Sequence, residues 1–222
     1  MTLTIDSRRR PRLDSQRFIG MNMPLAPVPG LPEICLHTTH PASGLRHLVG
    51  RGGNPPYWAY HWAGGLALAR HLLDHPETVA GRRVLDLGAG SGLVGIAAGK
   101  AGAGAVTAAE IDRNAIAALE LNARANGVSM TIVADDLTAG APPGVDLVLV
   151  GDLFYERKLA LRVTAFLDRC LAAGIDVLIG DPGRAFLPIE RLRRLAEYEV
   201  SDVGEVKDGA TSQSAVFSLE PP

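Results

Sequence analysis

From residue 82 onward, short apolar segments alternate with longer amphipathic ones, and this alternation constrains the fold more than any other feature of the sequence. The apolar segments are continuously apolar, which is typical of parallel strands covered on both faces. We predict strands at residues 84–87, 105–109, 131–134, 145–150 and 175–179, and helices at residues 93–101, 114–126 and 157–173. Asp112 can cap the second of these helices, which closes at Gly127. This order of elements predicts a doubly wound α/β fold.

The two ends of the chain follow other patterns. Prolines break residues 18–49, where we expect only a short strand at residues 33–37. Residues 57–73 have apolar side chains at three- and four-residue steps, which predicts a helix with Trp58 and Trp62 on one face. Near the carboxyl end we predict a basic amphipathic helix at residues 187–196, then an antiparallel hairpin of strands at residues 198–203 and 214–219.

Composition narrows the class of protein. The 222 residues are 47% hydrophobic with a formal charge of −2, which fits one soluble domain and lacks the basic footprint of a nucleic-acid binder. The apolar runs are too short to cross a bilayer. Cys35 and Cys170 are too few for a disulfide framework, so we expect a cytoplasmic protein. Residues 1–17 are basic without an apolar core, and we expect a flexible tail there rather than a secretory signal.

Carboxylates stand at the ends of four successive predicted strands. They are Asp86, Glu110, the pair Asp135 and Asp136, and Asp152. In open α/β sheets, ligands bind beyond the carboxyl ends of the strands, so these side chains are expected to surround a binding site.

The first of these acids opens a glycine loop of the form D-x-G-x-G-x-G, which contains Gly88, Gly90 and Gly92. Glycines let the backbone turn sharply and approach a ligand closely. Residues 90–95 also fit G-x-G-x-x-G, with Glu110 about twenty residues on, as in dinucleotide-binding proteins. A carboxylate at Asp86 is unhelpful to a pyrophosphate but suits a cationic or amino-bearing ligand such as S-adenosylmethionine. A plain tight turn remains the structural alternative.

Residues 84–95 (VLDLGAGSGLVG) resemble motif I of the class I S-adenosylmethionine-dependent methyltransferases. Further segments resemble the electron transfer flavoprotein β-subunit lysine methyltransferases: FI at 18–19, PEI at 32–34, PYWA at 56–59, WAGG at 62–65, LAR at 68–70, GDLFYE at 151–156 and GDPGR at 180–184. The resemblance implies a Rossmann-like, mostly parallel seven-stranded sheet with an antiparallel last strand. It also implies one methyltransferase domain over residues 18–222, with an N-terminal extension at 18–80 and a Rossmann-like core at 81–222.

The same resemblance implies roles for individual residues. Asp86 and the backbone of Gly88, Gly90 and Gly92 would hold the methionine part of S-adenosylmethionine, Glu110 the ribose hydroxyls and Asp136, in preference to Asp135, the adenine amino group. Trp62 would pack against the cofactor. Asp152 and Tyr155 match a D-x-x-Y pattern that faces the substrate amine, so we expect Asp152 to accept a hydrogen bond from the amine and Tyr155 and Phe154 to wall its pocket.

The function implied is methyl transfer to lysines of the electron transfer flavoprotein β subunit, with no metal required. Two alternatives stay open: a methyltransferase acting on a ribosomal protein or a small amine, and a nicotinamide-dinucleotide-binding protein. The sequence predicts neither a nucleic-acid nor a membrane partner, and it does not indicate the oligomeric state.

Several of these residues also have simpler interpretations. Trp58, Trp62 and Tyr155 could be ordinary core residues. His71 and His75 are four apart but lack an H-E-x-x-H pattern, so we expect no zinc site there. The arginines Arg191, Arg193 and Arg194 could be a solvated helix face or a docking site for an acidic partner. Residues 181–184 could be a simple turn or part of the substrate site.

Overall fold

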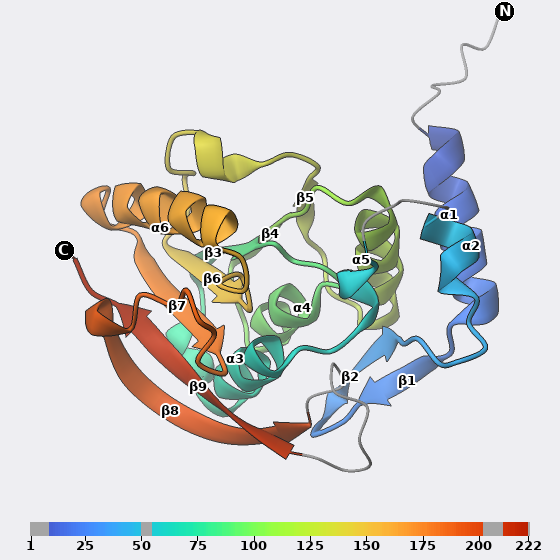
Figure 1. Cartoon of the computed structure of the whole chain (residues 1–222), viewed down its shortest axis with the longest axis horizontal. Coiled ribbons are helices and arrows are strands. Elements are labelled where there is room, and N and C mark those ends of the chain that lie inside the picture. Colours follow the sequence, from blue (N-terminus) through green and yellow to red (C-terminus); the bar gives the residue numbers. More distant parts are fainter. Residues whose placement is uncertain (1–8, 50–54, 202–210, 222) are drawn as a thin grey trace, which may run out of the picture.

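A computed structural model describes residues 9–49, 55–201 and 211–221, and its centre is a seven-stranded sheet (Figure 1). The strand order is β5-β4-β3-β6-β7-β9-β8. The strands are β3 (Arg83–Leu87), β4 (Ala105–Ala109), β5 (Thr131–Val133), β6 (Leu147–Gly151), β7 (Asp176–Asp181), β8 (Leu192–Ser201) and β9 (Thr211–Leu219). Strands β3 to β7 pair in parallel, whereas β9 is antiparallel to both of its neighbours. The predicted α/β fold with an antiparallel last strand is confirmed.

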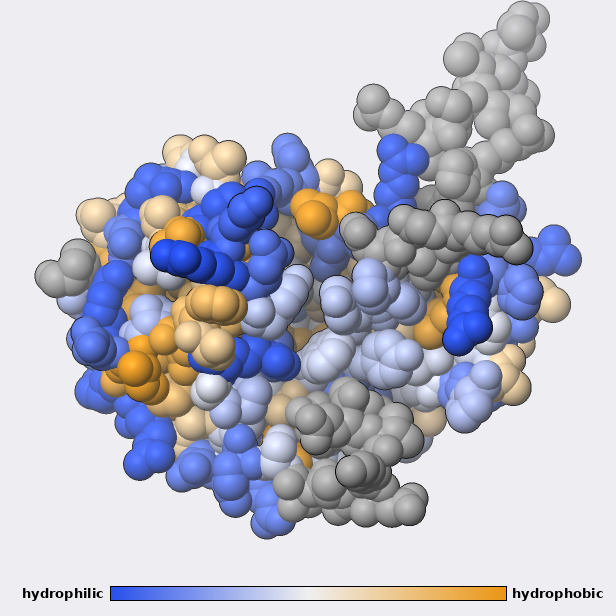
Figure 2. All heavy atoms as spheres, viewed as in Figure 1, coloured by the Kyte–Doolittle hydropathy of each residue, from blue (hydrophilic) through white to orange (hydrophobic). Residues whose placement is uncertain are grey.

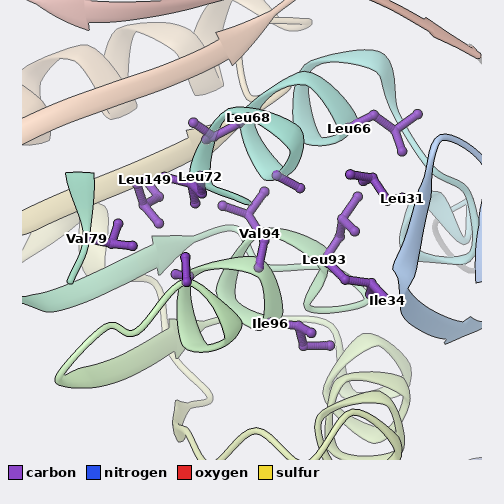
Figure 3. Close-up of a cluster of buried hydrophobic side chains, with 14 of the residues drawn as sticks. Leu31, Ile34, Leu66, Leu68, Leu72, Val79, Leu93, Val94, Ile96 and Leu149 are labelled. Atoms are coloured by element: carbon purple, nitrogen blue, oxygen red, sulfur yellow. The ribbon is translucent and has the colours of Figure 1, made fainter. Parts of the chain in front are cut away.

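Helices cover both faces of this sheet. Helices α3 (Ala63–Asp74) and α4 (Leu93–Lys100) pack on one face, where Val84, Leu149 and Leu178 belong to a shared apolar cluster (Figure 3). Helix α6 (Arg157–Ala172) packs on the other face against Leu85 and Val148. Neighbouring residues of one strand thus enter different clusters, because successive side chains of a strand point to opposite faces. This two-sided burial explains the unbroken apolar run at residues 147–150 of β6.

The amino-terminal part adds a small layer beside helix α5 (Arg113–Ala125). It consists of α1 (Arg9–Asn22), a hairpin of β1 (Leu25–Val28) and β2 (Leu31–His37), and α2 (Leu45–Val49). The expected strand at 33–37 is confirmed, but the expected flexible tail is wrong for residues 9–17, which belong to α1. Ile19 and Met23 are buried against α5, and Ser15 Oγ donates to Asn114 Oδ1 at 2.7 Å, so tertiary packing holds this helix. Residues 1–8 lie outside the described part.

The predicted helix at 57–73 begins later than expected. Tyr57–Ala59 forms a short 3₁₀ helix, and α3 starts at Ala63 with Trp62 as an extended N-cap residue. Trp62 Nε1 donates to the carbonyl oxygen of Tyr57 at 2.8 Å, which closes the bend between the two elements. Trp58 and Trp62 therefore do not share a helix face: Trp58 is 6% exposed in the cluster with Ile19 and Met23, whereas Trp62 is only partly buried.

The predicted basic helix at 187–196 is wrong. Residues Leu192–Ser201 form strand β8, preceded by a single 3₁₀ turn at Ile189–Arg191. A register shift between Arg194 and Ala196 interrupts the alternation of exposed and half-buried side chains. The sequence therefore lacks the two-residue period that would predict a strand. Pairing with β9 over the whole length of β8 satisfies the backbone and outweighs local helix preference. The hairpin strands predicted at 198–203 and 214–219 are parts of β8 and β9, with 202–203 outside the described residues.

The surface carries no long apolar band on the face shown in Figure 2, where apolar side chains form small groups among hydrophilic ones. The large apolar clusters lie inside, as Figure 3 shows for the one under α3 and α4. Among the helices of residues 9–49, 55–201 and 211–221, none is both long enough and apolar enough to cross a lipid bilayer.

Candidate active site

The glycine loop connects β3 to α4 at the carboxyl end of the sheet. Gly88, Gly90 and Gly92 have φ values of 70°, 54° and 89°, a left-handed backbone that disfavours any residue with a Cβ. The N–H groups of Gly88 and Ala89 donate to the carbonyl oxygen of Ala109 at the end of β4, both at 3.0 Å. The loop is therefore shaped by its glycines and tied to the neighbouring strand.

Asp86 lies one residue before the end of β3 and is 2% exposed. Its Oδ2 accepts a hydrogen bond of 2.8 Å from Gly95 N in the first turn of α4. Burial, together with the negative charge of Glu110, raises the pKa of Asp86 to about 7. A cationic group that binds beside Asp86 would stabilise the charged form of this buried carboxylate.

Glu110 follows β4 and bridges to the glycine loop. Its Oε2 accepts from Gly90 N, and its Oε1 accepts from Ile111 N and Asp112 N, each at 2.8 Å. Burial raises the pKa of Glu110, and the three N–H donors act in the opposite direction. The carboxylate thus has a defined position at the rim of the loop, twenty residues along the chain from Gly90.

Asp136 follows β5 and contacts Thr138 and Arg162, which are not part of the glycine loop. Its Oδ1 accepts from Thr138 N at 2.9 Å and so caps a 3₁₀ turn at Leu137–Ala139, while its Oδ2 pairs with Arg162 at 3.0 Å. The hydrogen bond from the Thr138 hydroxyl is the main reason that the pKa of Asp136 is lowered. In this structure Asp136 therefore has a local structural role at the outer edge of the site.

Asp152 comes directly after β6 and is 7% exposed. It has a φ of 58°, and no other non-glycine residue of the described chain has a positive φ. Its Oδ2 accepts from Gly65 N at 2.7 Å, and its Oδ1 accepts from Arg184 Nε at 3.1 Å and Nη2 at 2.6 Å. Burial still raises its pKa, with Arg184 opposing the shift. Strain of this kind concentrates at functional sites.

Two glycines bring the start of α3 against Asp152. A Cβ at Gly64 would lie 2.2 Å from the carbonyl oxygen of Gly180, and one at Gly180 would lie 2.1 Å from that of Gly64. Only glycine fits at both positions, and this close approach lets the first turn of α3 donate an N–H group to the carboxylate. Helix α3 thus contributes directly to the site.

Aromatic side chains form one rim of the site. Tyr155 is 48% exposed, and its ring centroid lies 5.9 Å from that of Tyr57, which lies 5.9 Å from that of Trp62. Tyr155 is therefore not an ordinary buried tyrosine. Phe154, in contrast, is fully buried in the cluster under α6, so the expectation that it walls a substrate pocket is wrong.

A cavity of about 70 Å³ lies between the glycine loop, the start of α3 and the end of β6. Of the predicted site residues, it is lined by Trp62, Asp86, Gly88, Gly90 and Asp152. The other four (Gly92, Glu110, Asp136 and Tyr155) lie outside its lining. The structure thus brings the two buried aspartates of β3 and β6 to one cavity, and it leaves Asp136 apart from it.

Sequence reasoning missed His61, and it left residues 181–184 open between a simple turn and a part of the substrate site. His61 lines the cavity, and burial lowers its pKa to about 4, so it is a neutral imidazole at physiological pH. Arg184 pairs with Asp152, and Asp181, 1% exposed, accepts from Gly183 N and Arg184 N at 2.8 and 2.7 Å. The GDPGR segment indicated Asp181 and Arg184, because it follows a predicted strand as GDLFYE does. The pairing of Arg184 with Asp152, 32 residues away, could not be predicted from the sequence.

Solved structures share this fold. A candidate RNA methyltransferase from Pyrococcus horikoshii superposes with a TM-score of 0.57 at 19% identity, covering 75% of this chain and 89% of that one. TrmN from Thermus thermophilus superposes with a TM-score of 0.52 at 24% identity, covering 71% of this chain and 49% of that one. At these identities the likeness concerns the fold alone.

Sequence relatives are more specific. Residues 63–163 match the methyltransferase small domain family. The electron transfer flavoprotein β-subunit lysine methyltransferases of Xenopus laevis and Danio rerio are each 42% identical to this chain, over 75% and 73% of it, and the human one is 36% identical over 75%. The chain spans 70%, 65% and 66% of the lengths of these three relatives. It therefore belongs to the electron transfer flavoprotein β-subunit lysine methyltransferases, a family of protein-lysine N-methyltransferases whose methyl donor is S-adenosylmethionine.

Proposed function

We propose that this chain methylates lysine side chains of an electron transfer flavoprotein β subunit. The observation that carries the proposal is a pair of buried aspartates that line the same cavity beside an aromatic rim: Asp86 near the end of β3 and Asp152 directly after β6. One carboxylate can receive a cationic donor, and the other, which pairs with Arg184 in this structure, can receive an amine. The names of the relatives supply the identity of the protein substrate.

The residues around Asp86 fit S-adenosylmethionine. A buried carboxylate with a raised pKa is stabilised by a positive amino or sulfonium group, and a left-handed glycine loop leaves room for close approach. In this proposal Asp86, Gly88, Gly90 and Gly92 hold the methionine part, Trp62 packs against it, Glu110 accepts from the ribose hydroxyls, and Asp136 accepts from the adenine amino group. The chemistry that the bound cofactor supplies is an electrophilic methyl group on a positively charged sulfur.

The task of the chain's own residues is to present a neutral amine. A lysine amine has a reference pKa of about 10.4, and its protonated form has no lone pair for attack. Desolvation beside Tyr57, Trp62 and Tyr155 favours the neutral form. Asp152 accepts a hydrogen bond from the amine and aligns its lone pair, while the proton leaves to water. Alignment of this kind contributes several kcal/mol. No metal is required, because the leaving group is a neutral sulfide.

The proposal is tested by incubating the protein with methyl-labelled S-adenosylmethionine and purified electron transfer flavoprotein. Label should appear on lysines of the β subunit, located by mass spectrometry, and it should be lost with the Asp152→Asn variant. Calorimetry with S-adenosylhomocysteine and with NAD provides the binding control. Binding of NAD alone, or labelling of a different protein only, would overturn the proposal.

Ribosomal protein L11 is the other substrate to include, because the L11 methyltransferase of Thermus thermophilus is 41% identical to this chain over 43% of it and 35% of the relative. The flavoprotein methyltransferases match 73% and 75% of this chain, so we favour the flavoprotein. Cys35 and Cys170 are free thiols, which supports the cytoplasm as the proposed compartment.

A further inference from the structure

We propose that Arg184 occupies the place of the substrate's lysine amine, so that the chain blocks its own acceptor site until this side chain withdraws. The inference rests on the proposed function and gives Arg184 a role that the proposed function does not use. It concerns the turn after β7 and its contacts with the end of β6 and the start of α3.

The first argument is the environment of the Arg184 guanidinium. Its Nη2 and Nε lie 2.6 and 3.1 Å from Asp152 Oδ1, and its central carbon lies 5.6 Å from the centroid of the Trp62 ring. The side chain is only 22% exposed. A carboxylate on one side and an aromatic face on the other are the groups that attract the positively charged end of a lysine side chain. Arg184 therefore fills a site built for the end of a long basic side chain.

The second argument is the number of acceptor positions on Asp152. A carboxylate offers about four lone-pair positions. Arg184 takes two at Oδ1, and Gly65 N takes one at Oδ2. An incoming amine has little of this carboxylate left to bind, and a protonated amine is repelled by the guanidinium. Arg184 must leave before the amine can bind as the proposed function requires.

The third argument is that the backbone of this turn is held by contacts of its own, independent of those made by the Arg184 side chain. Asp181 Oδ1 accepts from the backbone N–H groups of Gly183 and Arg184, and Gly183 has a φ of 93°. The guanidinium can therefore swing out by rotation about its side-chain bonds, with the turn in place. It is also a poor nucleophile where it lies, because a guanidinium stays protonated at every pH a protein tolerates.

The sharpest test is the Arg184→Lys variant, which would place a primary amine where the guanidinium lies. With S-adenosylmethionine present, we expect a methyl group at position 184 of this variant. The amine nitrogen forms a bond to the methyl carbon, the carbon–sulfur bond breaks to give S-adenosylhomocysteine, and the amine's proton passes to water. Peptide mapping by mass spectrometry locates the methyl group, and a rate independent of protein concentration identifies the reaction as intramolecular.

The matched control is Arg193→Lys. Arg193 lies on β8 and pairs with Glu220, and its side chain is 66% exposed. The same chemical change is thus made on the same molecule away from the cavity. We expect no methyl group at position 193.

A second variant measures the block itself. Arg184→Ala should lower the KM for the protein substrate about fivefold, the value of one modest ion pair, without lowering kcat. The affinity for S-adenosylhomocysteine should stay within about twofold, because the guanidinium is assigned to the acceptor side. Arg193→Ala should leave all three quantities unchanged.

The outcomes separate the inference from the proposed function. If the wild type methylates the flavoprotein while Arg184→Ala lowers kcat and Arg184→Lys stays unmodified, Arg184 is a positioning partner of Asp152 and the inference is wrong. If position 184 is methylated in Arg184→Lys but the flavoprotein is never labelled, the block stands and the proposed substrate is wrong. If the folded proteins transfer no methyl group at all, the proposed function fails, and the inference fails with it.

Discussion

The two edges of the central sheet use the same residue types with opposite results. At the amino ends of β3, β6 and β7, Arg83 pairs with Asp146 and Arg82 with Asp176 in exposed ion pairs. At the carboxyl ends of the same strands lie the buried Asp86, Asp152 and Asp181. Arg83 lowers the pKa of Asp146 to about 2, whereas burial raises those of Asp86 and Asp181 to about 7 and 6.

The difference shows that burial, and not residue identity, separates the two edges. An exposed aspartate with an arginine partner stabilises the fold modestly. A buried aspartate costs stability when it ionises, and a chain retains that cost where a ligand or a substrate benefits from the charge. The comparison predicts that the same Asp→Asn change will affect activity at one edge and only stability at the other.

The largest effect is expected for Asp152→Asn. Turnover should fall about a thousandfold, because the amine loses its charged acceptor, while affinity for S-adenosylhomocysteine should change less than about threefold. Asparagine tolerates the positive φ of this position, so the backbone should hold. Labelled methyl transfer and calorimetry measure the two quantities. Asp146→Asn, at the other end of β6, is the control and should keep full turnover. An equal loss of turnover and of S-adenosylhomocysteine affinity in Asp152→Asn would show that Asp152 binds the cofactor and not the amine.

Asp86→Asn should weaken binding of S-adenosylhomocysteine about a hundredfold, because the ligand's amino group loses a buried charged acceptor. The amide can still accept from Gly95 N, so the fold should remain. Calorimetry measures the affinity, and Asp176→Asn at the start of β7 should leave it unchanged. An unaltered affinity in Asp86→Asn would show that Asp86 does not bind the cofactor. The two ends of β3 would then not differ in function.

The buried Asp181 should make the wild type lose stability as the pH rises. Its folded pKa of about 6 lies above the unfolded value, so the folded chain binds the proton more tightly and the free energy of unfolding falls between about pH 4 and pH 6. In Asp181→Asn this decrease in the free energy of unfolding should be smaller by roughly 2 to 3 kcal/mol. The variant should therefore be more stable than the wild type at pH 7. Denaturant unfolding at pH 4 and pH 7 measures it. Parallel pH profiles of the two proteins would contradict the raised pKa.

The smallest effect is expected for Asp146→Asn. Its lowered pKa means that its contribution is present above about pH 4 and is lost as the pH falls through about 2. At pH 7 the unfolding midpoint should drop by about 1 to 3 °C, and at pH 2 the two proteins should coincide. Thermal unfolding followed by circular dichroism checks this. A loss of methyl transfer in this variant would erase the distinction between the two edges.

The sequence by itself determined the alternating core of the fold. The buried apolar residues of β3 and β6, the sharp glycine turn and the N-cap at Asp112, which accepts from Asn114 N and Ala115 N, are all local properties and were predicted. These features depend on the backbone preferences and burial of short segments, which neighbouring residues encode. The resemblance added the seven-stranded sheet with its antiparallel last strand and the roles of the individual aspartates.

Only the tertiary structure decided which distant groups meet. The strand at 192–201 exists because β9 pairs with it, and α1 is held by α5, although local patterns favoured a helix in one case and a tail in the other. Gly65 and Arg184 reach Asp152 across 87 and 32 residues, through a Gly64–Gly180 contact that no local pattern encodes. The physical reason is that remote segments stabilise one another by pairing only once the whole sheet has assembled. This stabilisation then exceeds the small helix or strand propensities of the short segments.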